Sequence, residues 1–205
     1  MNPLNKQHRK RIVDRHRDSL LRHGYSAQAL YWSSQHIQEL RFKVLAAIGI
    51  ADNDSVLDVG CGFADFKGWI NRHGISITYT GVDLSDDLLV IARERHEGVD
   101  LYCAELLECQ FAPASFDWVI LSGSLNEELN DEGAYARLVI EKMYQLATYG
   151  VAFNVLNARH APTQACGDLQ SFDPFELLAY CEGLGARCEL KQGYLDNDFT
   201  IYMHR

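Results

Sequence analysis

The sequence lacks any apolar run close to the roughly 18 residues that a membrane-spanning helix needs. Its first residues, MNPLNKQHRKR, carry charge without an apolar segment behind them, which argues against a signal peptide. Proline is scarce, with 4 among 205 residues, and the 15 glycines show no regular repeat, so collagen-like and mucin-like chains are excluded. We therefore expect a cytoplasmic protein that is not inserted in a membrane.

Paired cysteines are also missing. The cysteines form no Cys-x-x-Cys pair and lie near no pair of histidines at zinc spacing. Buried free cysteine behaves mostly as a small apolar side chain, so we expect reduced thiols, no disulfide framework and no metal site. The cysteines are Cys61, Cys103, Cys109, Cys166, Cys181 and Cys188.

The net charge of -9 is unevenly distributed. Residues 1–23 carry seven basic and two acidic side chains, or +5, whereas the remainder carries twelve basic and 26 acidic ones, or -14. Such a basic arm could contact nucleic acid or an acidic partner. Alternatively, it is an amphipathic helix with a basic exposed face. The apolar face would then be formed by Leu4, Ile12, Val13, Leu20 and Leu21.

The rest of the chain has a globular composition, with 47% apolar and 23% charged residues. Helices are predicted over residues 33–48, 65–73, 85–96, 132–146 and 174–183 or 185, and strands over 55–59, 75–82, 99–103, 116–121, 150–156, 187–190 and 199–203. This alternation predicts an α/β fold, a mostly parallel sheet with helices on both faces and a final antiparallel hairpin. We expect residues 1–50 to form a helical extension or lid, and residues 51–205 to form the α/β domain.

Ligands of such sheets bind beyond the carboxyl ends of the strands, so the loops there hold the candidate site. After the first predicted strand the sequence is VLDVGCGFADF, residues 56–66. Gly60 and Gly62 permit a sharp turn and close approach of a ligand. Asp58 and Asp65, however, would face or crowd the pyrophosphate of a nicotinamide dinucleotide. The loop therefore favours a zwitterion or cation, with Asp58 accepting a hydrogen bond from an ammonium group.

Acids also follow the next two predicted strands. Asp83 lies 21 residues beyond Gly62, where it can accept hydrogen bonds from both hydroxyls of a ribose. Glu105 follows the third strand and can accept from an exocyclic amine such as that of adenine, with Leu84 and Leu106 on either side of the base. These two loops together predict a nucleoside site.

In order and spacing these residues resemble the class I S-adenosylmethionine-dependent methyltransferases, over roughly residues 55–205. The resemblance implies a Rossmann-like, seven-stranded sheet and S-adenosylmethionine as the cofactor. Two departures are Ala64, where a third glycine is common, and the absence of the Asn-Pro-Pro-Tyr type of sequence found in amino-methylating nucleic-acid enzymes. The residues that match the family's cofactor-binding positions are Asp58, Gly60, Gly62, Asp83, Glu105 and, near the transferable methyl, Ser122.

Residues 25–42 precede the first strand, where this superfamily often places a lid over the cofactor. Arg41 would pair with the methionine carboxylate, and Tyr25 or Trp32 would close over the sulfonium by cation–π attraction. Alternatively, this segment is a helix that packs on the sheet and leaves Arg41 on the surface.

The sequence says little about the methyl acceptor. Asn126 and Asn154 are candidates to orient an acceptor by hydrogen bonds, and His160 is the nearest candidate for a general base. The acidic body favours a small-molecule acceptor, whereas an RNA or protein acceptor would use basic residues 1–23. A non-catalytic S-adenosylmethionine-binding protein is a further alternative.

Overall fold

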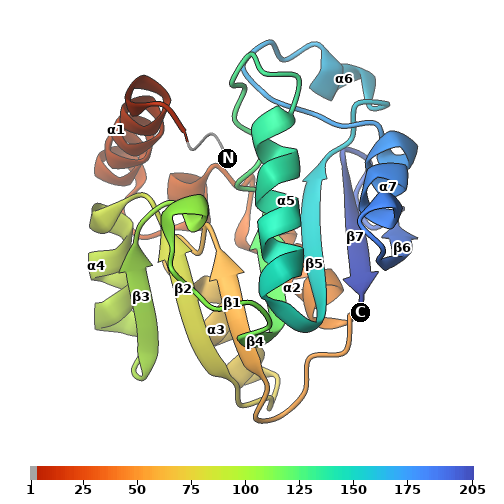
Figure 1. The fold of residues 1–205 in the computed structure, drawn as a ribbon. Helices are drawn as coiled ribbons and strands as arrows, with labels where there is room; N and C mark the ends of the chain where they lie inside the picture. Colours follow the sequence, from red (N-terminus) through yellow and green to blue (C-terminus); the bar gives the residue numbers. More distant parts are fainter. Residues whose placement is uncertain (1–3) are drawn as a thin grey trace.

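The computed structural model describes residues 4–205, which form a seven-stranded sheet of order β3-β2-β1-β4-β5-β7-β6 (Figure 1). Every neighbouring pair is parallel except the two pairs that include β7. The strands are β1 (Ser55–Val59), β2 (Thr78–Asp83), β3 (Val99–Cys103), β4 (Phe116–Ser122), β5 (Ala147–Leu156), β6 (Arg187–Lys191) and β7 (Asp198–His204). The predicted mostly parallel sheet with a C-terminal antiparallel hairpin is confirmed.

Helices cover both faces of the sheet. Side chains from α2, α3 and α4 pack on one face, and side chains from α5 and α7 pack on the other. The helices are α1 (Lys6–His23), α2 (Gln35–Ala46), α3 (Asp65–Arg72), α4 (Asp86–Arg95), α5 (Ala134–Leu146), α6 (Ala161–Gln164) and α7 (Pro174–Gly183), with short 3-10 turns η1 (Ala27–Leu30) and η2 (Leu106–Glu108).

The two cores follow from the alternation of side chains along each strand. In β4, Val119 and Leu121 belong to the core beneath α5 and α7, whereas Trp118 and Ile120 belong to the core beneath α2 and α3. All four side chains are buried. A strand that is covered on both faces becomes apolar throughout, which is why the run from residue 116 to 121 predicts a central parallel strand.

The second strand begins later than predicted, at Thr78 instead of residue 75. The backbone of Ser76 is already engaged, because its N–H donates to Asp52 at 2.7 Å and its carbonyl accepts from the N–H of Asn53 at 2.7 Å. These bonds tie residue 76 to the turn before β1 and keep it out of the ladder with β1. The apolar pattern alone does not reveal such a tie.

The N-terminal helix α1 lies across the carboxyl end of the sheet, above β3 and α4 (Figure 1). Its start is fixed by Asn5, whose side-chain oxygen accepts from the N–H of His8 at 2.8 Å. The helix is polar overall, but Leu4 just before it is buried, and Ile12 and Leu20 are partly buried. Between residues 4 and 205, no helix combines the length and apolar character needed to cross a membrane.

Adjacent positions of α4 test the assignment of the core beneath this helix. Leu89 is fully buried, whereas the next residue, Val90, is 45% exposed. We expect Leu89→Ala to lower the free energy of unfolding by about 2 to 5 kcal/mol, because it removes apolar contacts and leaves a cavity. Val90→Ala is the matched control and should change it by less than about 0.5 kcal/mol. Urea titrations followed by circular dichroism measure both, and equal effects would contradict the assignment.

Candidate functional site

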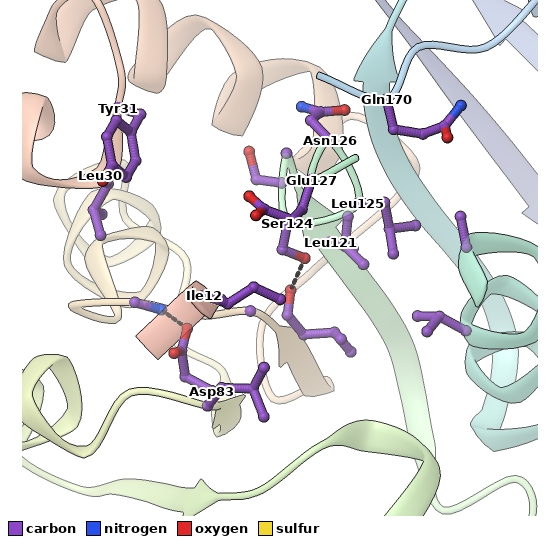
Figure 2. A pocket seen from close by; sticks show the side chains of 18 of the residues that line it. Ile12, Leu30, Tyr31, Asp83, Leu121, Ser124, Leu125, Asn126, Glu127 and Gln170 are labelled. Carbon is purple, nitrogen blue, oxygen red and sulfur yellow. Dashed lines mark hydrogen bonds between the residues drawn. The ribbon is translucent and has the colours of Figure 1, made fainter. Parts of the chain in front are cut away.

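A cavity of about 610 Å³ opens at the carboxyl ends of β1, β2 and β4, beneath α1 and η1 (Figure 2). Its size is typical of a small-molecule site. The structure brings ten of the predicted site residues to its wall, whereas Asn154 and His160 do not line it. The ten are Arg41, Asp58, Gly60, Gly62, Asp83, Leu84, Glu105, Leu106, Ser122 and Asn126.

The glycine loop after β1 is shaped by contacts on both sides. Gly60 has φ +70°, and a Cβ added there would lie 2.4 Å from the Cβ of Ser124 in the loop after β4. Gly62 has φ +53° and lies against the side chain of Leu30. Ala64 has φ +56°. This left-handed conformation favours glycine, which explains why a third glycine is common at the equivalent position in the methyltransferases that the sequence resembles.

Asp83, at the end of β2, is held by the backbone on both sides. Its Oδ2 accepts from the N–H of Gly62 at 2.8 Å, and its Oδ1 accepts from the N–H of Ser85 at 2.9 Å. The carboxylate is thereby fixed between the glycine loop and the start of α4, at the edge of the cavity (Figure 2). A carboxylate has about four acceptor positions, so Asp83 keeps capacity for ligand hydroxyls.

Among the acids of the cavity wall, Asp58 has the most strongly shifted pKa. It is buried, and its Oδ2 accepts from the hydroxyl of Tyr79 at 2.7 Å. The pKa of Asp58 is raised to about 7, mainly by burial and also by the negative charges of Asp83 and Asp65, while the bond from Tyr79 opposes the rise. A cation at this position would relieve the cost of ionising Asp58.

Arg41 is buried, so its placement on the surface, the alternative considered from the sequence, is wrong. Its guanidinium forms an ion pair with Asp198 on β7 and lies 4.6 Å from the ring centroid of Trp32. Burial raises the pKa of Asp198 to about 6, and the charge of Arg41 opposes that rise. Arg41 also lines the cavity, so the residue that pairs with the buried Asp198 is part of the cavity wall as well.

Glu105 is not a solvated loop acid, because it is only 2% exposed. The N–H of Leu4 donates to both of its oxygens, at 3.0 and 3.1 Å, and the guanidinium of Arg9 donates to Oε2 at 2.7 Å. The acid predicted to receive an adenine amine is therefore bound by the N-terminal segment of the same chain. Sequence analysis missed this contact, which joins residues about a hundred positions apart.

Three other predicted residues lie elsewhere. Asn154 is fully buried and donates to the hydroxyl of Ser122 at 3.2 Å, so the structure does not bring it to the cavity wall. The ring of His160 contacts the hydroxyl of Thr163 at 2.8 Å, outside the cavity wall. Tyr25 is outside it too, since its hydroxyl donates to Asp65 at 2.6 Å. Asn126 lines the cavity, but its side-chain oxygen accepts from the backbone of β5.

Among the cavity residues that sequence analysis missed are three of α1. Ile12, Arg15 and His16 line the cavity from above, together with Tyr31 and Glu127 (Figure 2 shows Ile12, Tyr31 and Glu127). Ile12 and His16 are four positions apart and therefore share one face of the helix. The four-residue spacing indicates a shared helix face, but the sequence does not show which surface of the protein that face covers.

Five of the seven Lys and Arg residues of α1 form ion pairs, four of them with acids of the body. Among residues 4–23, Arg9 pairs with Glu105 and Glu108, Arg11 and Arg15 with Glu127, Arg17 with Asp87, and Lys10 with Asp14 inside the helix. Four of these five cations thus bind acids outside the helix. The prediction of an amphipathic helix with a basic exposed face is therefore correct only in part. Leu4 is buried and Ile12 is partly buried, but Leu21 is 81% exposed and four arginines face acids of the body.

Known proteins resemble this chain in sequence and in fold. Residues 56–150 match a family described as "Methyltransferase domain". A protein of Mycobacterium tuberculosis whose name assigns it to the methyltransferases is 25% identical over 162 residues, which cover 76% of this chain and 92% of that protein.

Solved structures share the fold over most of the chain. The magnesium protoporphyrin IX methyltransferase of Synechocystis, with bound S-adenosylmethionine, has a TM-score of 0.66 at 14% identity and covers 100% of both chains. An S-adenosylmethionine-dependent methyltransferase from Mesorhizobium loti has a TM-score of 0.65 at 17% identity and covers 81% of this chain and 98% of that chain.

The sheet order and these matches support a class I S-adenosylmethionine-dependent methyltransferase. It is thus an enzyme that transfers a methyl group, and S-adenosylmethionine is its cofactor. The reading as a non-catalytic binding protein is set aside.

The raised pKa of Asp58 predicts how stability depends on pH. Between about pH 4 and pH 7 the folded protein keeps a proton on Asp58 that the unfolded chain has lost, so this residue makes stability fall as pH rises through that window. Asp58→Asn should remove that part of the fall. Urea titrations at several pH values measure the difference, and Asp86→Asn, on an exposed side chain, is the control. Parallel curves for the wild type and Asp58→Asn would contradict the assignment.

Proposed function

We propose that this methyltransferase acts on a small molecule held between the end of β4 and α1, with its cofactor along the ends of β1, β2 and β3. In this proposal Asp58 accepts from the cofactor's ammonium group, Asp83 from the ribose hydroxyls and Glu105 from the adenine amine. Gly60 and Gly62 leave room beside the backbone. The bound cofactor supplies a methyl group that its sulfonium charge already activates.

The remaining predicted residues take the ends of the same ligand. Leu84 and Leu106 flank the base, Ser122 lies at the methyl end, and Arg41 faces the methionine carboxylate. The fit of S-adenosylmethionine to this cavity rests on charge, because neither Asp58 nor Asp83 has a cationic partner among residues 4–205. A ligand with an ammonium and a sulfonium group supplies the missing positive charge.

The single observation that carries the choice of a small acceptor is the docking of α1. Five of the seven basic residues that would have to contact RNA instead pair with acids of the same chain, and the helix that carries them covers the cavity. An RNA phosphate would have to break these ion pairs in order to replace them. A covered cavity of about 610 Å³ suits a molecule that enters the protein.

We further propose that His16 replaces His160 as the base that takes a proton from the acceptor. The Nδ1 of His16 lies 2.9 Å from the carbonyl oxygen of Ile12. A carbonyl only accepts, so Nδ1 carries the proton and Nε2 is left with a free lone pair. The ring lies edge-on to Tyr31, with 5.6 Å between centroids, in the wall of the cavity. Where the acceptor is protonated, Nε2 would receive its proton as the acceptor attacks the methyl group.

Binding of S-adenosylhomocysteine tests the cofactor site. We expect calorimetry to give micromolar binding to the wild type and a loss of at least about tenfold in Asp83→Ala, because two hydroxyl bonds to a charged group are lost. Asp86→Ala, three residues away on an exposed side chain, is the matched control and should bind like the wild type. Unchanged affinity in Asp83→Ala would contradict the proposed role of Asp83.

A spectroscopic comparison tests the position of His16. S-adenosylmethionine and S-adenosylhomocysteine differ by one methyl group and its charge, so we expect the nitrogen resonances of His16 to differ between the two complexes. His23, exposed near the end of the same helix, is the control and should be unchanged. Identical His16 resonances in both complexes would place this ring away from the transferred methyl group.

A further inference from the structure

The most unusual contact of the site is the one between Glu105 and the start of the chain. Glu105 is buried at the end of the cavity where adenine is expected, yet its carboxylate already has two donors from residues 4–9. We propose that this N-terminal segment competes with the adenine of the cofactor for Glu105, so that the segment must leave the acid before the cofactor binds fully. The proposal rests on the proposed adenine-binding role of Glu105.

The positions around the carboxylate carry this inference. The N–H of Leu4 lies 3.0 Å from Oε1 and 3.1 Å from Oε2, so it occupies the edge between the two oxygens. Arg9 takes a further position on Oε2. Tyr135 lies against the same acid, and burial first, then the charge of Glu105, raises the pKa of Tyr135, which keeps its hydroxyl protonated. An adenine amine that approaches the edge between the oxygens meets the Leu4 N–H.

The side chain of Leu4 adds a second obstacle. It is 8% exposed and lines the same cavity as Leu84 and Leu106, the residues expected to flank the base. The segment therefore places an N–H donor on the acid and an apolar group in the cavity, as adenine itself would. Two groups that need the same acceptor and the same space exclude each other.

Glu108 lowers the free-energy cost of releasing the segment from Glu105. Arg9 donates to both oxygens of Glu108, at 3.0 and 2.7 Å, so it keeps a bidentate partner when it leaves Glu105. Glu108 is 45% exposed, and an ion pair with an exposed partner is weak. The segment thus acts as a latch that is closed without cofactor and that lowers apparent affinity by the fraction of molecules in which it is open.

The latch predicts that weakening the segment strengthens cofactor binding. In the full-length protein, Arg9→Ala should bind S-adenosylhomocysteine about two- to fivefold more tightly in calorimetry, the range expected for one such ion pair. Lys10→Ala is the matched control, because Lys10 contributes the same charge but pairs only with Asp14 inside the helix. Leu4→Pro, which removes the N–H, should also bind more tightly than Leu4→Ala, which keeps it. Weaker or unchanged binding by Arg9→Ala overturns the competition.

Amide hydrogen exchange separates this proposal from the assignment of the cofactor site. With S-adenosylhomocysteine bound, we expect faster exchange at residues 4–9 and slower exchange at residues 60–62. Slower exchange at both places means that the segment closes on the ligand, and it overturns the competition while leaving the cofactor site intact. Slower exchange at residues 60–62 alone overturns the competition in the same way. No change at either place overturns both the competition and the proposed cofactor site.

Discussion

Negative charge gathered at one edge of the sheet is the constraint on which the rest of this structure depends. Because β1, β2 and β3 are parallel, their carboxyl ends bring Asp58, Asp83 and Glu105 to one cavity. Burial, together with the charges of Asp83 and Asp65, raises the pKa of Asp58. Positive charge must come from the ligand or from elsewhere in the chain. Arg9 supplies it at Glu105, at one end of the cavity, and we propose that the ligand supplies it at Asp58.

The N-terminal helix is the chain's own source of positive charge. Four of its arginines pair with acids of the loops after β3 and β4 and of α4, so ion pairs help to fix α1 across the cavity. Half-exposed ion pairs are individually weak and are screened by salt, so contacts of this kind can break without loss of the core. The same helix carries Ile12 and His16, which form part of the cavity wall.

The sheet, and the grouping of Gly60, Gly62 and Asp83 around one cavity, could be predicted because their signals are local. Apolar alternation marks the strands, and Gly60, Gly62 and Asp83 stand at fixed places after them. Arg41 could not be placed, because its partner Asp198 lies 157 residues away on β7. The burial of Asn154 and the exclusion of His160 depend likewise on how the loops after β4 and β5 pack. The spacing of Ile12 and His16 places them on one face of α1, but the surface that this face covers depends on tertiary packing.

The most direct test of this account is the number of protons released when S-adenosylhomocysteine binds. Calorimetry near pH 7 in buffers of different ionisation enthalpy measures it. If the edge of the sheet receives the ligand's ammonium group through Asp58, ligand binding lowers the pKa of that acid and protons are released, and Asp58→Asn abolishes the release. Proton uptake, or release that is the same in Asp58→Asn, would contradict the account.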